Sequence, residues 1–230
     1  MLLHSSSVML ALKQALSLSS TKILGAWSPG QEASLVAWYQ YQTGITLNGS
    51  DVSEWADYTG VYNMKQLTAT KQPAYLEAYG TLTFDSADTQ FLQTTGQIIL
   101  AGDFTIGFRV EPFTFQGAVL GDNTTSGEFI RFNTATLIRI TINSVNLEFT
   151  ITSAGDDYYV LTRSGSDINL HQNGVLNATT KTSSDDADID TIGARRTNAS
   201  PFDGTMKEIQ IYSSTSATLT ANVNTRLAEL

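Results

Sequence analysis

The sequence predicts an all-β sandwich of two antiparallel sheets, with a short helix near each end. Three observations carry this prediction: apolar and polar residues alternate in many short runs, Gly- and Asn-rich turns separate the runs, and only 15% of the 230 residues are charged. Alternation with a period of two buries one face of a strand. Many short strands joined by such turns are typical of sandwiches and jelly rolls.

The first 30 residues differ from the rest of the chain. The serines at 5–7 can cap a helix, and the turn at 28–30 contains Pro and Gly. The apolar face of this predicted helix comprises Val8, Met9, Leu12 and Leu16. We therefore expect an N-terminal arm with a short helix and linker over residues 1–30, and one domain over residues 31–230. The arm would dock on a neighbour; the alternative is a helix that covers one sheet of its own domain.

Short runs of alternating residues between positions 35 and 176 are predicted strands. The runs cover residues 35–41, 104–110, 137–142, 145–151, 158–162 and 168–172. Asn143-Ser144 separates the two strands of a predicted hairpin. Asn173-Gly174 is the strongest turn signal in the chain, because both residues tolerate a positive φ.

The last quarter of the chain predicts a loop, a strand and a helix. The polar stretch 179–190, which carries four aspartates near its end, is predicted to be a solvated loop. A final strand follows the Gly-containing turn at 202–204. Residues 220–230 are predicted to be helical with Thr220 as the cap. The apolar face of this helix comprises Val223 and Leu227.

Composition excludes several classes of partner and site. The net charge of −9 disfavours binding to nucleic acid or to an anionic membrane surface. The absence of cysteine excludes disulfides and thiolate metal sites. No run approaches the ~20 apolar residues of a membrane-spanning helix. The first seven residues carry no Lys or Arg, so we expect no secretory signal and assembly inside the cell.

Four segments in order resemble laminin G-like domains of the concanavalin type. They are residues 103–110, 158–174, 192–193 and 202–204, and residues 52–60 and 82–85 resemble a preamble found before such domains. The resemblance covers residues 35–230 and implies a concanavalin-like jelly roll. Thr59 stands where that preamble more often has Ser. The whole chain lacks cysteine, is rich in Ser, Thr and Asn, and has a short arm before its domain, and in these respects it is similar to virion proteins of tailed phages. A fold shared by lectins, glucanases and coat proteins does not settle function.

No arrangement of catalytic residues stands out. Glycoside hydrolysis needs two carboxylates facing one cleft, which on one strand means positions two or four residues apart. The nearest candidates are Glu208, Glu148 and the aspartates at 185–190, and none has such a partner on a strand. The two histidines, His4 and His171, are too few for a zinc site without cysteine. We therefore predict a protein that is not an enzyme, with no catalytic residues.

Binding residues are easier to nominate than catalytic ones. Exposed aromatic rings bind sugars in folds of this kind, and the candidate sugar-contacting residues are Trp55, Tyr58 and Tyr62, from a wider set with Trp27, Tyr75 and Tyr79. The resemblance also implies Ca²⁺ held by loop carboxylates. Candidate ligands are Asp122, Asn123, Asp156, Asp157 and the acidic residues at 185–190. Solvated turn residues are the alternative interpretation, so no cofactor is predicted and Ca²⁺ stays an open possibility.

Three functions are compatible with these observations. The first hypothesis is a virion structural protein, a capsid decoration or fibre-associated subunit that forms homo-oligomers, is assembled in the host cytoplasm and docks on other virion proteins through its arm. The alternative is a carbohydrate-binding module of an adhesin or receptor-binding protein, which would bind cell-surface glycans. The third is a divergent glucanase.

Overall fold

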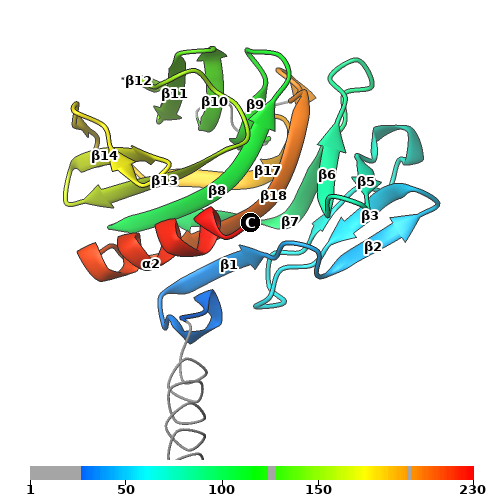
Figure 1. Cartoon of the computed structure of the whole chain (residues 1–230), viewed down its shortest axis with the longest axis horizontal. Helices are drawn as coiled ribbons and strands as arrows, with labels where there is room; N and C mark the ends of the chain where they lie inside the picture. Colours follow the sequence, from blue (N-terminus) through cyan, green and yellow to red (C-terminus); the bar gives the residue numbers. More distant parts are fainter. Residues whose placement is uncertain (1–26, 124–127, 196–197) are drawn as a thin grey trace, which may run out of the picture.

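The part of the chain described below forms an antiparallel β-sandwich with one α-helix on its outer surface (Figure 1). We describe it from a computed structural model that covers residues 27–123, 128–195 and 198–230. The arm residues Val8, Met9, Leu12 and Leu16 therefore lie outside the described residues. The two stacked sheets confirm the fold class that the period-two runs predicted. Within the described part of the chain, no helix is long and apolar enough to cross a membrane.

The first sheet is built around β18, which lies between β8 on one edge and both β1 and β6 on the other. Beyond β8 the sheet continues through β13 to β14 and its short neighbours. Its strands are β1 (Leu35–Tyr39), β5 (Ala74–Leu76), β6 (Thr81–Phe84), β8 (Phe104–Pro112), β13 (Asp157–Ser164), β14 (Asp167–Gln172), β15 (Val175–Leu176), β16 (Lys181–Thr182) and β18 (Gly204–Tyr212).

The second sheet runs in the order β4, β7, β17, β9, β10, β11 and β12. Its strands are β4 (Met64–Lys65), β7 (Leu92–Leu100), β9 (Ala118–Gly121), β10 (Phe129–Thr134), β11 (Leu137–Ile142), β12 (Val145–Thr150) and β17 (Ala187–Ile192). The hairpin of β2 (Ile45–Asn48) and β3 (Asp51–Trp55) joins the two sheets, because β3 pairs with both β4 and β5. Two 3₁₀ turns complete the domain, η1 (Pro29–Gln31) and η2 (Ala69–Lys71).

Both predicted hairpin turns are confirmed. Asn143 and Ser144 have φ angles of 44° and 65° and connect β11 to β12. Asn173 and Gly174 have φ angles of 50° and 78° and connect β14 to β15. Positive φ at both central positions matches the right-handed twist of the flanking strands. The turn chemistry therefore fixes the register of these two hairpins.

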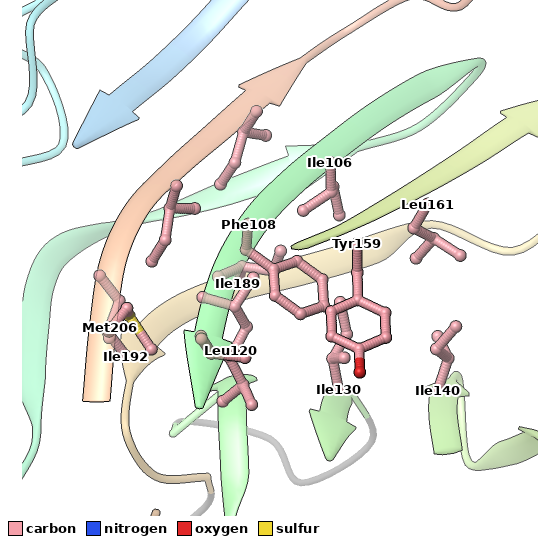
Figure 2. Close-up of a cluster of buried hydrophobic side chains, with 14 of the residues drawn as sticks. Ile106, Phe108, Leu120, Ile130, Ile140, Tyr159, Leu161, Ile189, Ile192 and Met206 are labelled. Atoms are coloured by element: carbon pink, nitrogen blue, oxygen red, sulfur yellow. The ribbon is translucent and has the colours of Figure 1, made fainter. Parts of the chain in front are cut away.

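The core lies between the inner faces of the two sheets (Figure 2). Phe108 of β8 stacks on Tyr159 of β13, with ring centroids 5.4 Å apart. Facing them, the second sheet contributes Leu120, Ile130 and Ile189, all more than nine-tenths buried. Interdigitated side chains of this kind hold a sandwich together without disulfides, because each fully buried Leu, Ile or Phe contributes about 1.5–3 kcal/mol.

The helix α2 (Ala217–Ala228) confirms the predicted C-terminal helix but begins earlier than expected. Its cap is Ser216, whose side-chain oxygen accepts a hydrogen bond from the Leu219 backbone N–H at 3.0 Å, so Thr220 lies inside the first turn. Its apolar side packs on the outer face of the first sheet, and comprises Leu219, Val223 and Leu227. Gly107 of β8 permits this close approach, since a Cβ there would lie 2.4 Å from Val223 Cγ1.

The prediction of a solvated loop over residues 179–190 is correct for residues 183–186 but wrong for residues 187–190, and residues 181–182 form the short strand β16. Residues 187–192 form β17, which lies between β7 and β9 in the second sheet. Ala187 and Ile189 face the core, and Asp188 and Asp190 occupy the alternate positions of the strand, whereas Asp185 and Asp186 precede it. Charge content alone misled the prediction, because a strand needs only alternate residues to be apolar.

The start of the described chain is already part of the domain. Trp27 Nε1 donates a hydrogen bond to Glu32 Oε1 at 2.6 Å, and the Trp27 ring lies 6.5 Å from that of Tyr212. The expected turn at 28–30 corresponds to η1. The chain therefore enters the domain from a fixed point beside α2.

Candidate functional site

A groove lies on the outer face of the first sheet, at the C-terminal end of α2. Lys207 and Thr205 of β18 form its floor, and the β5–β6 turn and the connection after β8 form its walls. We call this feature the aromatic groove and define it by Tyr41, Tyr79, Glu111, Phe113, Asp156 and Lys207. It occupies the part of the outer face that α2 leaves uncovered.

The aromatic residues of the groove are exposed but held in place. Tyr79 is 69% exposed and Phe113 is 54% exposed. The hydroxyl of Tyr41 donates a hydrogen bond to the Tyr79 carbonyl at 2.8 Å, and the Tyr41 N–H donates to Glu208 at 3.1 Å. Large exposed rings on a braced turn offer apolar area to a ligand with little loss of conformational freedom.

The charged groups of the groove neutralise one another. Asp156 accepts hydrogen bonds from Arg109 Nε at 2.9 Å, Arg109 Nη2 at 3.0 Å and Lys207 Nζ at 2.8 Å. Burial would raise the pKa of Asp156, but these hydrogen bonds outweigh it and hold the pKa below its ordinary value. The hydrogen bond to Asp156 in turn raises the pKa of Arg109. Glu111, by contrast, forms no ion pair with any described residue.

A second cluster of polar side chains lies at the rim of the second sheet. Carboxylate oxygens of Asp122, Glu128 and Asp188 all lie within 4.8 Å of one another. They come from the end of β9, the start of β10 and from β17. We call them the acidic rim. Asp185 and Asp186 line an adjoining pocket, so the local charge is strongly negative.

Burial and mutual repulsion disfavour the ionised state of the acidic rim. Burial raises the pKa of Glu128, with Asp188 and Asp122 adding to the shift and a hydrogen bond from the Asn143 N–H opposing it. Burial also raises the pKa of Asp188, and the charge of Asp122 adds to it. Asp188 Oδ1 is buried without a hydrogen-bond partner among the described residues. Three converging carboxylate oxygens are the hard donors that a Ca²⁺ ion takes in proteins.

Arg163 fastens the loop beside the acidic rim. Its side chain is 1% exposed, and it donates to the carbonyls of Gly102 at 2.6 Å and Leu100 at 2.7 Å. It also donates to the carbonyl of Asp185, which lies in the loop beside the acidic rim. Through this buried guanidinium the turn between β7 and β8 holds the acidic loop in place.

The nominated sugar-contacting residues do not form one surface. Trp55 is fully buried, with its indole N–H donating to the Gln40 carbonyl at 3.1 Å, so the expectation that it contacts sugar is wrong. Tyr58 is exposed and lies against Trp38, with ring centroids 5.1 Å apart. Tyr62 is half-buried, and its carbonyl accepts a hydrogen bond from the Tyr39 hydroxyl. None of these three side chains lines the aromatic groove.

The preamble around Asp57 has a structural explanation. The Asp57 carboxylate accepts hydrogen bonds from the backbone N–H groups of Trp38 at 2.7 Å, Thr59 at 3.2 Å and Tyr62 at 3.3 Å. One buried carboxylate thus accepts the hydrogen bonds of backbone N–H groups in the turn and connects the turn to β1. The Trp-x-Asp-x-Thr-Gly pattern of this segment therefore marks a turn that the Asp57 carboxylate holds together.

Of the wider aromatic set, only Tyr79 lines the groove. Trp27 and Tyr75 are half-buried against the domain. Sequence reasoning missed Tyr41, Phe113 and Lys207, which come from separate parts of the chain. No local pattern could have grouped them, because the sheet pairing and the position of α2 bring them together.

The predicted calcium ligands divide into two groups. Asp122 and the 185–190 segment do meet, in the acidic rim, together with Glu128, which the sequence did not indicate. Asn123 instead donates from its side chain to Gln93 at 3.0 Å. Asp157 accepts from Asn173, and Asp156 belongs to the aromatic groove.

The other carboxylates considered for catalysis are committed to ion pairs. Glu208 is fully buried beneath α2 and accepts from Arg226 at 3.1 and 2.8 Å. Glu148 pairs with Arg139 across the β11–β12 hairpin at 2.5 Å.

Burial lowers the pKa of His171.

Comparison with known proteins identifies the fold family. The family model described as "Concanavalin A-like lectin/glucanases superfamily", of the laminin G type, matches residues 85–221, more than half of the chain. This match confirms the resemblance inferred from the sequence. No curated protein sequence matches the chain significantly.

Solved structures share the fold at low sequence identity. Domain 4 of an extracellular GH43 arabinanase from Geobacillus stearothermophilus, solved in complex with arabinotriose, is 16% identical with a TM-score of 0.60, over 86% of this chain and 99% of that domain. The sialidase of Trypanosoma rangeli is 12% identical with a TM-score of 0.53, over 86% of this chain and 33% of the enzyme. At these identities the likeness concerns the fold alone.

Proposed function

Because the chain belongs to the concanavalin A-like lectin/glucanases superfamily, we propose that it is a non-enzymatic carbohydrate-binding protein whose sugar site is the aromatic groove. The observation that carries this proposal is the pair of exposed rings, Tyr79 and Phe113, beside a floor of hydroxyl and charged groups. A sugar ring presents apolar C–H faces and polar edges, and a groove of this mixed character suits both. The arabinotriose bound to the arabinanase domain supports a small oligosaccharide as the ligand class.

The charge arrangement supports binding without hydrolysis. A glycosidase keeps one carboxyl group protonated as its acid and a second ionised, about 5–10 Å apart. The pKa of Asp156 is lowered by two cations, which is the wrong direction for an acid. Asp156 therefore cannot be that acid.

We further propose that the acidic rim holds Ca²⁺ through Asp122, Glu128 and Asp188. The ion would neutralise the repulsion among these carboxylates and stabilise the edge of the sandwich. Its role is structural, since the aromatic groove is built from the outer face of the other sheet.

A glycan array followed by titration calorimetry tests the sugar site. Tyr79→Ala and Phe113→Ala should each weaken the binding of any glycan found by about tenfold or more. Tyr58→Ala is the matched control, because this ring is comparably exposed but lies outside the groove. Equal losses in all three variants, or none in the groove variants, would contradict the assignment.

A virion structural role is the second proposal, and the fixed position of Trp27 favours it. The arm joins the domain at a residue anchored by Glu32 and Tyr212, so a partner that held the arm would also orient the domain. Such a subunit would form a homo-oligomer and display the groove outward from the virion surface. Deleting residues 1–26 should leave a folded domain that no longer joins a particle. Normal incorporation of the truncated chain would refute the docking arm.

A further inference from the structure

We propose that Asp156 restricts the aromatic groove to uncharged oligosaccharides by keeping the cations Arg109 and Lys207 engaged. This inference rests on the proposed function and goes further, because it names the ligand class and the residue that sets it. Arg109 is on β8, Lys207 is on β18, and Asp156 precedes β13. Three segments of the first sheet thus meet at one carboxylate.

Both cations are occupied on more than one side. Arg109 places two nitrogens on Asp156, and its third, Nη1, donates to the Leu227 carbonyl at the end of α2 at 3.1 Å. Lys207 Nζ contacts Asp156 at 2.8 Å and the Leu230 carbonyl at 3.4 Å. The Arg109 and Lys207 side chains are only 16% and 15% exposed. A carboxylate or sulfate on a sugar would have to displace a preformed charge-assisted network to reach either cation.

The remaining charges near the groove oppose an anionic ligand. Arg109 and Lys207 balance Asp156 and Glu111, which leaves no excess positive charge. Glu77 lies on the β5–β6 turn, next to the wall residue Ala78. Like charges brought together at an interface cost several kcal/mol, so an acidic sugar meets repulsion that no cation relieves.

An uncharged sugar meets a favourable surface in the same place. The Asp156 side chain is 40% exposed and can still accept a hydroxyl hydrogen bond. Glu111 offers a further acceptor, and Tyr79 and Phe113 offer apolar faces. Neutral hydroxyl groups can donate to these carboxylates without disturbing the ion pairs.

The decisive variant is Asp156→Asn, which releases two cations while keeping the size of the side chain. The wild-type protein should bind neutral trisaccharides, such as arabinotriose and cellotriose, about tenfold or more tightly than trigalacturonate. The variant should narrow or invert this preference. Its gain in affinity for trigalacturonate should shrink at high salt, because the new attraction is electrostatic. Calorimetry of each pair gives the ratio directly.

Glu148→Gln is the matched control. It also removes one carboxylate from an arginine pair, Arg139 on the second sheet, and changes the net charge by the same amount. It should leave the ratio of neutral to acidic binding unchanged. If Glu148→Gln shifted the ratio as much as Asp156→Asn, overall charge and not Asp156 would be responsible.

The outcomes separate this inference from the proposed function. If the wild type binds trigalacturonate as tightly as the neutral sugars and Tyr79→Ala abolishes both, the groove binds sugar but the selectivity proposal is wrong. If no glycan on a broad array binds the wild type, the proposed function fails and this inference fails with it. Should Asp156→Asn melt well below the wild type, Lys207→Gln replaces it. This variant leaves Asp156 with one cation fewer and makes the groove more negative, so the preference for neutral sugars over trigalacturonate should widen, and an unchanged or narrowed preference would overturn the proposal.

Discussion

The aromatic groove and the acidic rim treat charge in opposite ways. In the groove, Asp156 is shared by two cations and its pKa falls below the ordinary value. At the rim, burial raises the pKa values of Glu128 and Asp188, and the neighbouring carboxylates add to both shifts. This difference is the basis on which we propose an uncharged ligand for the groove and a cation for the rim. The comparison teaches that one fold can hold a carboxylate among cations on one sheet and a carboxylate among other carboxylates on the other, with pKa shifts in opposite directions.

The largest expected effect on stability comes from Glu208, the buried residue that supports the aromatic groove from below. Glu208→Ala should lower the free energy of unfolding by about 3 kcal/mol, because it leaves Arg226 without its buried partner. Tyr41 would also lose the acceptor of its backbone N–H. Urea denaturation measures the change. If the two regions are independent, the response of this variant to Ca²⁺ should equal that of the wild type.

Calcium should produce the next largest effect, and only through the rim. At a Ca²⁺ concentration about one hundred times Kd, binding adds about 2.7 kcal/mol to the free energy of unfolding. Asp188→Asn and Glu128→Gln should each reduce this gain, whereas Asp156→Asn should not. Thermal melts with Ca²⁺ and with a chelator measure this gain. Equal melting temperatures in the two conditions would contradict the proposal that the acidic rim binds Ca²⁺.

Acid should shift the stability of the two regions in opposite directions. Without Ca²⁺, the ionised rim carboxylates destabilise the fold, so their contribution improves as the pH falls through their raised pKa values towards the ordinary values of 4.5 for Glu and 3.8 for Asp. Asp156 stabilises the fold above its ordinary pKa, and that contribution is lost as the pH falls through its lowered pKa.

Unfolding curves of Glu128→Gln and Asp156→Asn between pH 3 and 7 measure these two contributions separately. The stability difference from the wild type should change with opposite slopes in the two variants. Parallel slopes would mean that the two regions do not differ in the way proposed.

The smallest effect on stability should come from the exposed rings. Phe113→Ala should change the free energy of unfolding by no more than about 0.5 kcal/mol, because the side chain is largely in water. A much larger loss in urea denaturation would show that the ring supports the fold, and any loss of sugar binding would then be indirect.

The sequence predicted the architecture because alternation and turn chemistry are local. Asn173-Gly174 adopts the expected turn, since its φ angles depend on the two residues themselves. The strand at 187–192 was missed because its outward positions are acidic and its apolar positions are few. Whether an acidic segment lies in a loop or in a sheet depends on distant partners, here β7 and β9.

The binding regions were less predictable than the fold for the same physical reason. Trp55 and Tyr79 are both large aromatic residues, yet one is fully buried and the other 69% exposed. Residue type does not reveal this difference, because burial depends on which elements pack against the residue. Asp122 and the 185–190 segment, both nominated as calcium ligands, do meet at Asp188, but Glu128 joins them only through the pairing of β9 with β10.

The location of β18 has a consequence for how the protein is made. This strand follows every other strand in the sequence, yet it occupies the middle of the first sheet, between β8 and the pair β1 and β6 (Figure 1). A nascent chain that has not yet delivered residues 204–212 leaves the edge of β8 unpaired and its apolar side chains open to water. The first sheet can therefore close only after residues 204–212 have been translated. A chain that is truncated before them would expose an unpaired strand edge and an apolar sheet face, both of which promote aggregation.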